Sequence, residues 1–200
     1  MLRLSLFSDR LQWLSLVSAL RLLLAFFMLI YALGLWRGLA ADTDPEDRFD
    51  ELIIAAAARH ALPPSLIKAV IRQESEFKPW AAGADGEIGL MQITRMAVTD
   101  WEGATDRLCP FNGMLTDPRL NIEIGSWYLS RAYDRWQGYR DVEVLALAQY
   151  NAGGSRAVQW APGDVRESVI ERISIESTRD YIKSVLNYRE QYVKERIPEQ

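Results

Sequence analysis

The segment 65–75 has the periodicity of an α-helix, and its apolar stripe leads into a carboxylate. The stripe consists of Ile67, Val70 and Ile71. Glu74 follows those residues by seven, four and three positions, so it continues the buried face of the helix. Because a carboxylate is costly to remove from water, a buried Glu74 is expected to hold its proton to higher pH, as a general acid must. The structural alternative is a glutamate that pairs with an arginine such as Arg72 or caps the helix end.

The rest of the pattern also predicts helices. A first helix is expected to begin at Asp44-Pro45, as a cap followed by a proline at the first helical position, and to run to about Ala61. Further helices are expected after Ile93, over 121–136, from Asp141 to Gly153-Gly154, and from a capping box at 177–180. Proline and glycine breakers predict an irregular segment over 103–118. No stretch alternates as a strand does, so the predicted fold class is all-α.

The first forty residues differ from the rest. An uncharged run over 22–36 is preceded by three arginines and ended by Arg37. As a helix it would rise about 22 Å, short of the ~30 Å hydrocarbon core, so it suits either a signal peptide or a short membrane anchor. Small residues at 38–41 offer a cleavage site, whereas Trp13 and Trp36 suit the interfaces of an anchor. Positive residues before the run and acidic ones after it predict an N-terminus inside and an exported body.

Charge and composition exclude several function classes. Residues 41–200 carry 19 basic and 26 acidic side chains, a net charge of −7, which argues against a nucleic-acid partner. A single cysteine, Cys109, cannot form an intramolecular disulfide. With one cysteine and one histidine, a zinc or haem site is not expected, and no metal or cofactor is predicted. The histidine, His60, is interpreted as a surface or helix-end residue.

Five segments carry a resemblance to a known family. E-S-x-F-x-P stands at 74–79, G-x-x-G-L-M-Q at 86–92, and A-x-Y-N-A-G at 148–153. Further matching segments lie at 121–129 and 178–182. In this order and spacing, the chain over roughly 50–190 resembles the catalytic domain of the soluble lytic transglycosylase (SLT) family.

The resemblance implies a lysozyme-like α-helical fold and cleavage of the bond between N-acetylmuramic acid and N-acetylglucosamine in peptidoglycan. It implies one catalytic carboxylate, which maps onto Glu74. In the family, the substrate's own acetamido oxygen is thought to stabilise the anomeric carbon. The same glutamate then acts as a base on the C6 hydroxyl, which closes a 1,6-anhydro ring without water. Ordinary glycosidases instead use a second carboxylate.

The resemblance also implies residues that bind the glycan. Ser75, Met91 and Gln92 match positions beside the catalytic residue and in the saccharide groove. The alternatives are a hydroxyl that caps the helix end for Ser75, core filling for Met91, and a buried structural amide for Gln92.

Three further candidates come from the later segments. Tyr150 and Asn151 precede Gly153 at a predicted helix end, where polar tips can point at a sugar or brace the helix. Tyr181 matches a tyrosine thought to reach the catalytic centre, although its stripe with Val185 also fits a core position.

The chain departs from the family pattern at two positions. Gly83 stands where many members have a serine thought to support the catalytic region, and Thr94 replaces a frequent proline. The local acids that could supply a second catalytic carboxylate are Glu76, Asp85 and Glu87, and these are interpreted as solvated loop charges.

The sequence therefore predicts a signal peptide or membrane anchor over 1–40, an acidic linker over 41–49 and an SLT-like catalytic domain over 50–195. The expected location is the periplasm, with a tether to the inner membrane if the N-terminal segment is not cleaved. Peptidoglycan glycan strands are the predicted partner, and a cell-envelope machine is a further one. A lysozyme-like hydrolase and a non-catalytic peptidoglycan-binding scaffold are the alternatives, and both keep the fold.

Overall fold

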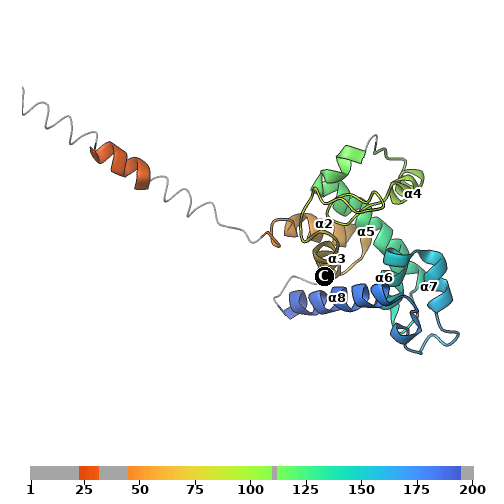
Figure 1. Cartoon of the computed structure of the whole chain (residues 1–200). Coiled ribbons are helices and arrows are strands. Elements are labelled where there is room, and N and C mark those ends of the chain that lie inside the picture. The colour runs from red at the N-terminus through yellow and green to blue at the C-terminus, as the bar shows by residue number, and fades with distance from the viewer. Residues whose placement is uncertain (1–22, 32–44, 110–111, 195–200) are drawn as a thin grey trace, which may run out of the picture. The chain divides into compact units, whose positions relative to one another are not determined.

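A computed structural model describes residues 23–31, 45–109 and 112–194 (Figure 1). The chain divides into two compact units, Met1–Asp44 and Pro45–Gln200. Within the first unit, residues 23–31 form a helix with exposed apolar side chains such as Phe27 and Met28. In the described part of the chain, no helix is both long and apolar enough to cross a membrane. The predicted signal or anchor over 1–40 lies outside the described residues except for this short helix, so it stays a prediction.

The second unit is built from helices, and the described residues contain no strand. The helices are α2 (Asp50–His60), α3 (Pro64–Ser75), α4 (Arg95–Thr105), α5 (Pro118–Arg135), α6 (Val142–Ala152), α7 (Gly154–Trp160) and α8 (Glu176–Lys194). Two 3₁₀ turns, Asn112–Thr116 and Ile170–Arg172, lie between them. Extended pairing is limited to isolated bridges of Ile88 with Ala82 and Ile93. The all-α prediction is confirmed for these residues, and His60 ends α2 as expected.

Two predicted helix starts were wrong. α2 begins at Asp50 rather than at Pro45, because the residues before it form turns whose acidic side chains bond to other helices. α8 begins at Glu176, ahead of the predicted capping box, and Thr178 donates its hydroxyl to Asn151 Oδ1 at 2.9 Å. In both places the polar side chains make contacts that are distant in sequence instead of local caps.

Asp141 holds the predicted cap position of α6 but does not cap it. Its carboxylate accepts hydrogen bonds from the backbone N–H of Val169 and the hydroxyl of Ser168 instead. Pro64 and Pro118 stand at the first turns of α3 and α5, where a missing N–H costs nothing.

The core is centred on α3, which packs most extensively against α8 (Figure 1). Every residue of α3 from Pro64 to Ile71 is buried, so the helix is enclosed on all sides over its first two turns. α5 packs against α2, α4 and α6. The end of α3 is therefore held in place by the surrounding helices, and this end carries Glu74.

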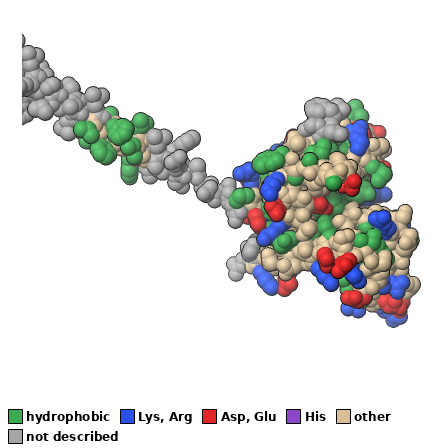
Figure 2. All heavy atoms as spheres, in the orientation of Figure 1, with side chains coloured by type: hydrophobic (Ala, Val, Ile, Leu, Met, Phe, Trp, Pro, Cys, Tyr) green, Lys and Arg blue, Asp and Glu red, His purple; other side chains and the backbone are tan. Residues whose placement is uncertain are grey.

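A charged cluster joins the start of this unit to α3 and α8. The buried Lys68 ammonium lies 2.8 Å from Asp47 and 2.7 Å from Asp50. Tyr192 on α8 donates its hydroxyl to Glu46 at 2.6 Å, and Arg72 on α3 lies 3.3 Å from the same carboxylate oxygen. Elsewhere on the visible face, acidic and basic side chains are interspersed (Figure 2).

We predict that Tyr192→Phe lowers the free energy of unfolding by about 1 kcal/mol, because a half-buried Glu46 loses one of its hydrogen-bond donors. Lys194→Ala is the matched control on the same helix, since its ion pair with Glu190 is solvent-exposed and contributes little. Urea denaturation of both variants measures the difference. Equal losses in the two would contradict a special role for the Tyr192 contact.

Candidate active site

Glu74 lies in the last turn of α3; the residue is partly exposed, but its carboxyl is largely buried. Tyr181, from the first half of α8, donates its hydroxyl to Glu74 Oε1 at 2.7 Å. The arginine alternative is not what the structure contains, because Arg72 bonds to Glu46 and stacks on the Tyr188 ring at 4.3 Å. Glu74 therefore has a neutral partner where a structural ion pair would have a cation.

Burial raises the pKa of Glu74 from 4.5 to about 7. The hydrogen bond from Tyr181 works in the opposite direction, and the negative charge of Glu87 adds to the rise. Burial also raises the pKa of Tyr150 and of Tyr181 well above 10, so both phenols remain donors at neutral pH. The carboxyl can thus be either protonated or ionised near neutrality.

The loop between α3 and α4 folds back on itself over 81–93. The Gly83 N–H donates to the Glu87 carbonyl at 2.8 Å, and the Gly89 N–H donates to Ala81 at 2.8 Å. Gly89 has φ +86°, and a Cβ there would overlap Asn121 Nδ2 and the Leu115 carbonyl. Glycine is therefore required at this point for both its conformation and its size.

Three side chains attach this loop to three helices. The buried Asn121 of α5 accepts from the Met91 N–H at 2.8 Å and donates to the Ile88 and Leu115 carbonyls at 2.8 Å each. Ser75 at the end of α3 donates to the Leu90 carbonyl at 2.8 Å. Tyr150 of α6 donates to the Met91 carbonyl at 2.8 Å. The loop is thus fixed relative to Glu74 through its own backbone.

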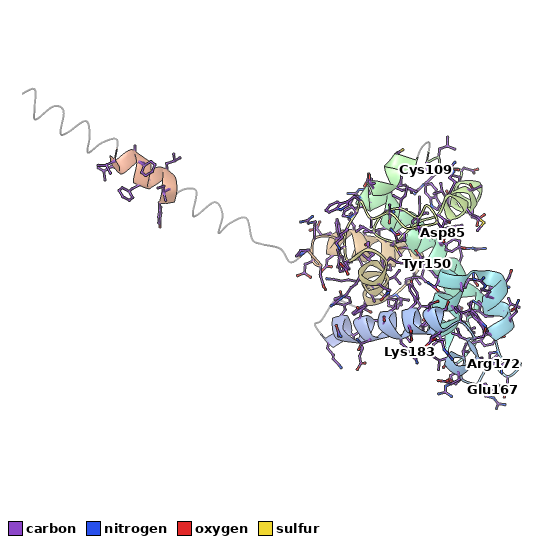
Figure 3. The ribbon with its side chains drawn as sticks, viewed as in Figure 1. Asp85, Cys109, Tyr150, Glu167, Arg172 and Lys183 are labelled. Carbon is purple, nitrogen blue, oxygen red and sulfur yellow. The ribbon has the colours of Figure 1, made fainter. Side chains whose placement is uncertain are left out.

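An open cavity of about 290 Å³ lies between this loop and the end of α6. Figure 3 labels Tyr150 and also Asp85, which belongs to the loop. The cavity is lined by Glu74, Gly83, Ala84, Glu87, Gln92, Thr94, Tyr150 and Asn151. It therefore combines a carboxyl of raised pKa with several convergent polar groups, which is the usual character of a binding site.

Besides Glu74 itself, four of the six predicted glycan-binding residues line this cavity or touch Glu74 directly. Gln92 and Asn151 line it together with Tyr150, and Tyr181 contacts the carboxyl of Glu74. Gln92 also bonds through Nε2 to the carbonyls of Ala81 and Gly89, so it is a structural amide as well.

Ser75 and Met91 are placed differently. The Ser75 hydroxyl is buried and bonds to two backbone carbonyls, those of Ile71 and Leu90. The Met91 side chain is fully buried, and a Cβ at Gly125 would overlap its sulfur. Neither side chain is among the residues that line the cavity, so their part as glycan ligands stays a prediction. What the structure assigns to them is support of the loop and filling of the core.

Sequence reasoning gave no role in the site to two polar residues that line the cavity and to one residue that supports it. Glu87 is half-buried and lines the cavity, and Thr94 lines it while capping α4 through the Ala97 N–H. Asn121 stood in a matching segment without an assigned task. The sequence feature that could have identified Asn121 is its place as a polar residue on the same helix face as Ile124, at the start of a strongly helical segment.

A larger hollow of about 690 Å³ lies elsewhere, between α4 and α5, and is lined by residues that include Arg59, Trp101 and Glu123. The Glu123 carboxylate in this hollow is paired with Arg59 and Arg107, whereas Glu74 has a neutral partner. The smaller cavity is therefore the candidate active site. Among the described residues, no group of three or more His, Cys, Asp or Glu side chains could hold a metal ion.

Comparison with known proteins identifies the family of this chain. The family model described as Transglycosylase SLT domain matches residues 51–169. The soluble lytic murein transglycosylase of Escherichia coli K12 is 32% identical over 162 residues, which are 74% of this chain and 24% of that protein. Membrane-bound lytic murein transglycosylase F of Desulfosudis oleivorans is 39% identical over 109 residues, 53% of this chain and 22% of that protein.

Solved structures agree with these sequence matches. The 70 kDa soluble lytic transglycosylase of Escherichia coli superposes with a TM-score of 0.68 at 29% identity, over 74% of this chain and 24% of that one. An inactive mutant of the lytic transglycosylase Slt from Pseudomonas aeruginosa gives a TM-score of 0.67 at 29% identity, with the same coverage. The chain spans about a quarter of the length of the two curated relatives. On the family match and the shared lysozyme-like fold, this chain belongs to the transglycosylase SLT family.

Proposed function

We propose that this protein is a peptidoglycan lytic transglycosylase that cleaves the bond between N-acetylmuramic acid and N-acetylglucosamine and leaves 1,6-anhydro ends. The observation that carries the proposal is the Glu74 carboxyl, whose pKa is raised to about 7 at the edge of a polar cavity. The names of the relatives, which are murein transglycosylases, support the choice of substrate.

A single carboxyl with this pKa is suited to act first as an acid and then as a base. Protonated Glu74 gives its proton to the glycosidic oxygen, and the bond from that oxygen to the anomeric carbon breaks. The acetamido oxygen of the substrate stabilises the positive charge on that carbon. Ionised Glu74 then takes the proton from the C6 hydroxyl, whose oxygen bonds to the anomeric carbon. Glu74 ends protonated as it began, and no water is consumed.

Tyr181 and the cavity residues orient this chemistry. Because Tyr181 donates to Oε1 of Glu74, the transferable proton belongs on Oε2. Asn151 accepts from Thr178 through Oδ1, which leaves its amide N–H groups free to donate to a sugar. Gln92 uses Nε2 for the loop and presents Oε1 as an acceptor. We assign the three residues to positioning of the acid and of the glycan.

One observation favours a second candidate, a hydrolase. Glu87 lines the same cavity as Glu74, and a second carboxylate can activate water in glycosidases. The two candidates differ in their products, because hydrolysis adds water to the new end and transglycosylation does not.

We expect the purified chain to release muropeptides from peptidoglycan that are lighter by one water molecule than hydrolysis products. Glu74→Gln, which cannot give a proton, should release none. Mass spectrometry of the released fragments makes the measurement. Products with reducing ends would establish the hydrolase instead. Retained binding to peptidoglycan with no release by the wild-type chain would establish a non-catalytic scaffold.

The raised pKa of Glu74 also predicts a stability effect that needs no substrate. The folded protein binds this proton more tightly than the unfolded chain, so the stability it contributes is present below pH 4.5 and is lost as pH rises through about 7. Glu74→Gln escapes this loss. Relative to the wild type, we expect the free energy of unfolding of Glu74→Gln to increase by about 1–2 kcal/mol from pH 5 to pH 8. This is less than the full pKa shift implies, because the carboxyl is not completely shielded from solvent.

Denaturation at the two pH values measures that gain. Glu76→Gln is the control, because Glu76 is exposed and Lys78 lowers its pKa. Parallel stability curves for the wild type and Glu74→Gln would mean that Glu74 is ionised in the folded protein at both pH values.

We further propose that residues 1–40 export the domain to the periplasm, as a cleaved signal or as an inner-membrane anchor, with 41–49 as a linker. The exposed apolar side chains of the helix over 23–31 support such a segment. Intact-mass measurement on fractionated cells decides between them. A full-length chain in the membrane fraction indicates an anchor, and a chain shortened near residue 40 indicates a signal. A full-length chain in the cytoplasm would refute export. Association with a cell-envelope machine stays a prediction of the sequence.

A further inference from the structure

Gly83 leaves a space in the cavity wall that another side chain fills. A Cβ built on Gly83 would overlap Glu87 Oε2 and would lie 2.8 Å from Gln92 Oε1. The backbone at Gly83 is not among the positions of positive φ, so its conformation suits any residue. A side chain at position 83 would therefore displace the ends of Glu87 and Gln92 without straining the backbone.

Glu87 is held in that space by the loop itself. The Asp85 N–H donates to Glu87 Oε2 at 3.0 Å, and the Gly83 N–H donates to the Glu87 carbonyl at 2.8 Å. Gly86, at φ +88°, provides the turn that folds the Glu87 side chain back over Gly83. Glu87 is therefore bonded to the loop through both its backbone carbonyl and its carboxylate.

The surroundings of Glu74 explain what this second carboxylate does. Tyr181 from α8 and Tyr150 from α6 face Glu74 as neutral phenols, and Glu87 faces it from the loop as a charge. The residues that line the cavity include two carboxyl groups and no lysine, arginine or histidine. The negative charge of Glu87 disfavours ionisation of Glu74, and no cation of the lining opposes it.

We propose that Gly83 and Glu87 form a matched pair, in which the absent side chain at position 83 admits the Glu87 carboxylate to the cavity beside Glu74. Glu87 is then a positioning residue that acts through Glu74. Before cleavage it favours the protonated acid. After the proton has moved to the leaving oxygen, two carboxylates face the positive charge that develops on the sugar, which is an electrostatically favourable arrangement. The pairing itself follows from the geometry, and only its effect on turnover rests on the proposed function.

Titration of the Glu74 carboxyl by carbon NMR in the full-length protein tests the pair without substrate. Glu87→Gln removes the charge and keeps the shape, so the pKa of Glu74 should fall. Asp85→Asn is the matched control, an acid-to-amide change in the same loop at an exposed side chain that does not line the cavity. Asp85→Asn should leave the pKa of Glu74 unchanged. Tyr181→Phe removes a hydrogen bond that lowers this pKa, so it should shift the titration upward.

A double-mutant cycle tests the matching of the two positions. Gly83→Ala forces the Glu87 carboxylate out of its space, so it should lower the pKa of Glu74 as Glu87→Gln does. In a Glu87→Ala background the same change has no carboxylate to displace, and its effect should shrink to what displacement of Gln92 causes. A shift as large in that background as in the wild type would overturn the pair. So would an unchanged pKa in Glu87→Gln.

Activity against pH is the second readout. As pH rises, the peptidoglycan-cleaving activity of Glu87→Gln should decline at a lower pH than that of the wild type. We expect about three- to tenfold less activity than the wild type at pH 8 and a smaller loss at pH 5. An equal loss at both pH values would indicate a merely structural role and overturn the inference. If no variant cleaves peptidoglycan while the NMR shifts appear as expected, the proposed function fails and the pair stands.

Discussion

Removal of the Glu74 carboxyl from water is the constraint on which the rest of the site depends. The carboxyl stands at the end of a helix that is enclosed over its first turns, and its hydrogen-bond donor, Tyr181, comes from α8. α3 packs most extensively against α8, so one interface both stabilises the fold and places the acid against its donor. The charged cluster that includes Lys68, Arg72 and Tyr192 joins the same two helices near the C-terminal end of α8.

The loop opposite Glu74 is held through its main chain, and this makes it a rigid wall for the cavity. Ser75, Asn121 and Tyr150 each come from a different helix, and each bonds to a backbone group of the segment from Ile88 to Met91. Buried backbone groups are costly to leave unpaired, so each contact both satisfies the loop and fixes its distance from the acid. A motif residue can therefore contribute to a site by supporting its wall, without contacting the ligand.

Periodicity predicted the interiors of α3, α5 and α6 because apolar spacing depends on local sequence and on one buried face. It failed at the starts of α2 and α8, where Asp47 and Thr178 bond to side chains 21 and 27 residues away. The residues that the motifs single out with Glu74 include Gln92, Tyr150 and Asn151, which line one cavity with it. The motifs could not tell whether the Ser75 hydroxyl and the Met91 thioether contact a ligand or support the loop and core. Both roles favour the same residue types.

The pairing of Gly83 with Glu87 could not be predicted from either residue alone. In the sequence, Glu87 is an acid in a polar loop, and solvation is the ordinary expectation for it. Gly83 stands out in the sequence as a departure from the family serine, but its backbone is of ordinary conformation and its importance lies in the atoms it lacks. An empty space leaves no periodicity, charge or spacing in a sequence. The pairing becomes visible only in three dimensions, where the turn at Gly86 places the Glu87 side chain over Gly83.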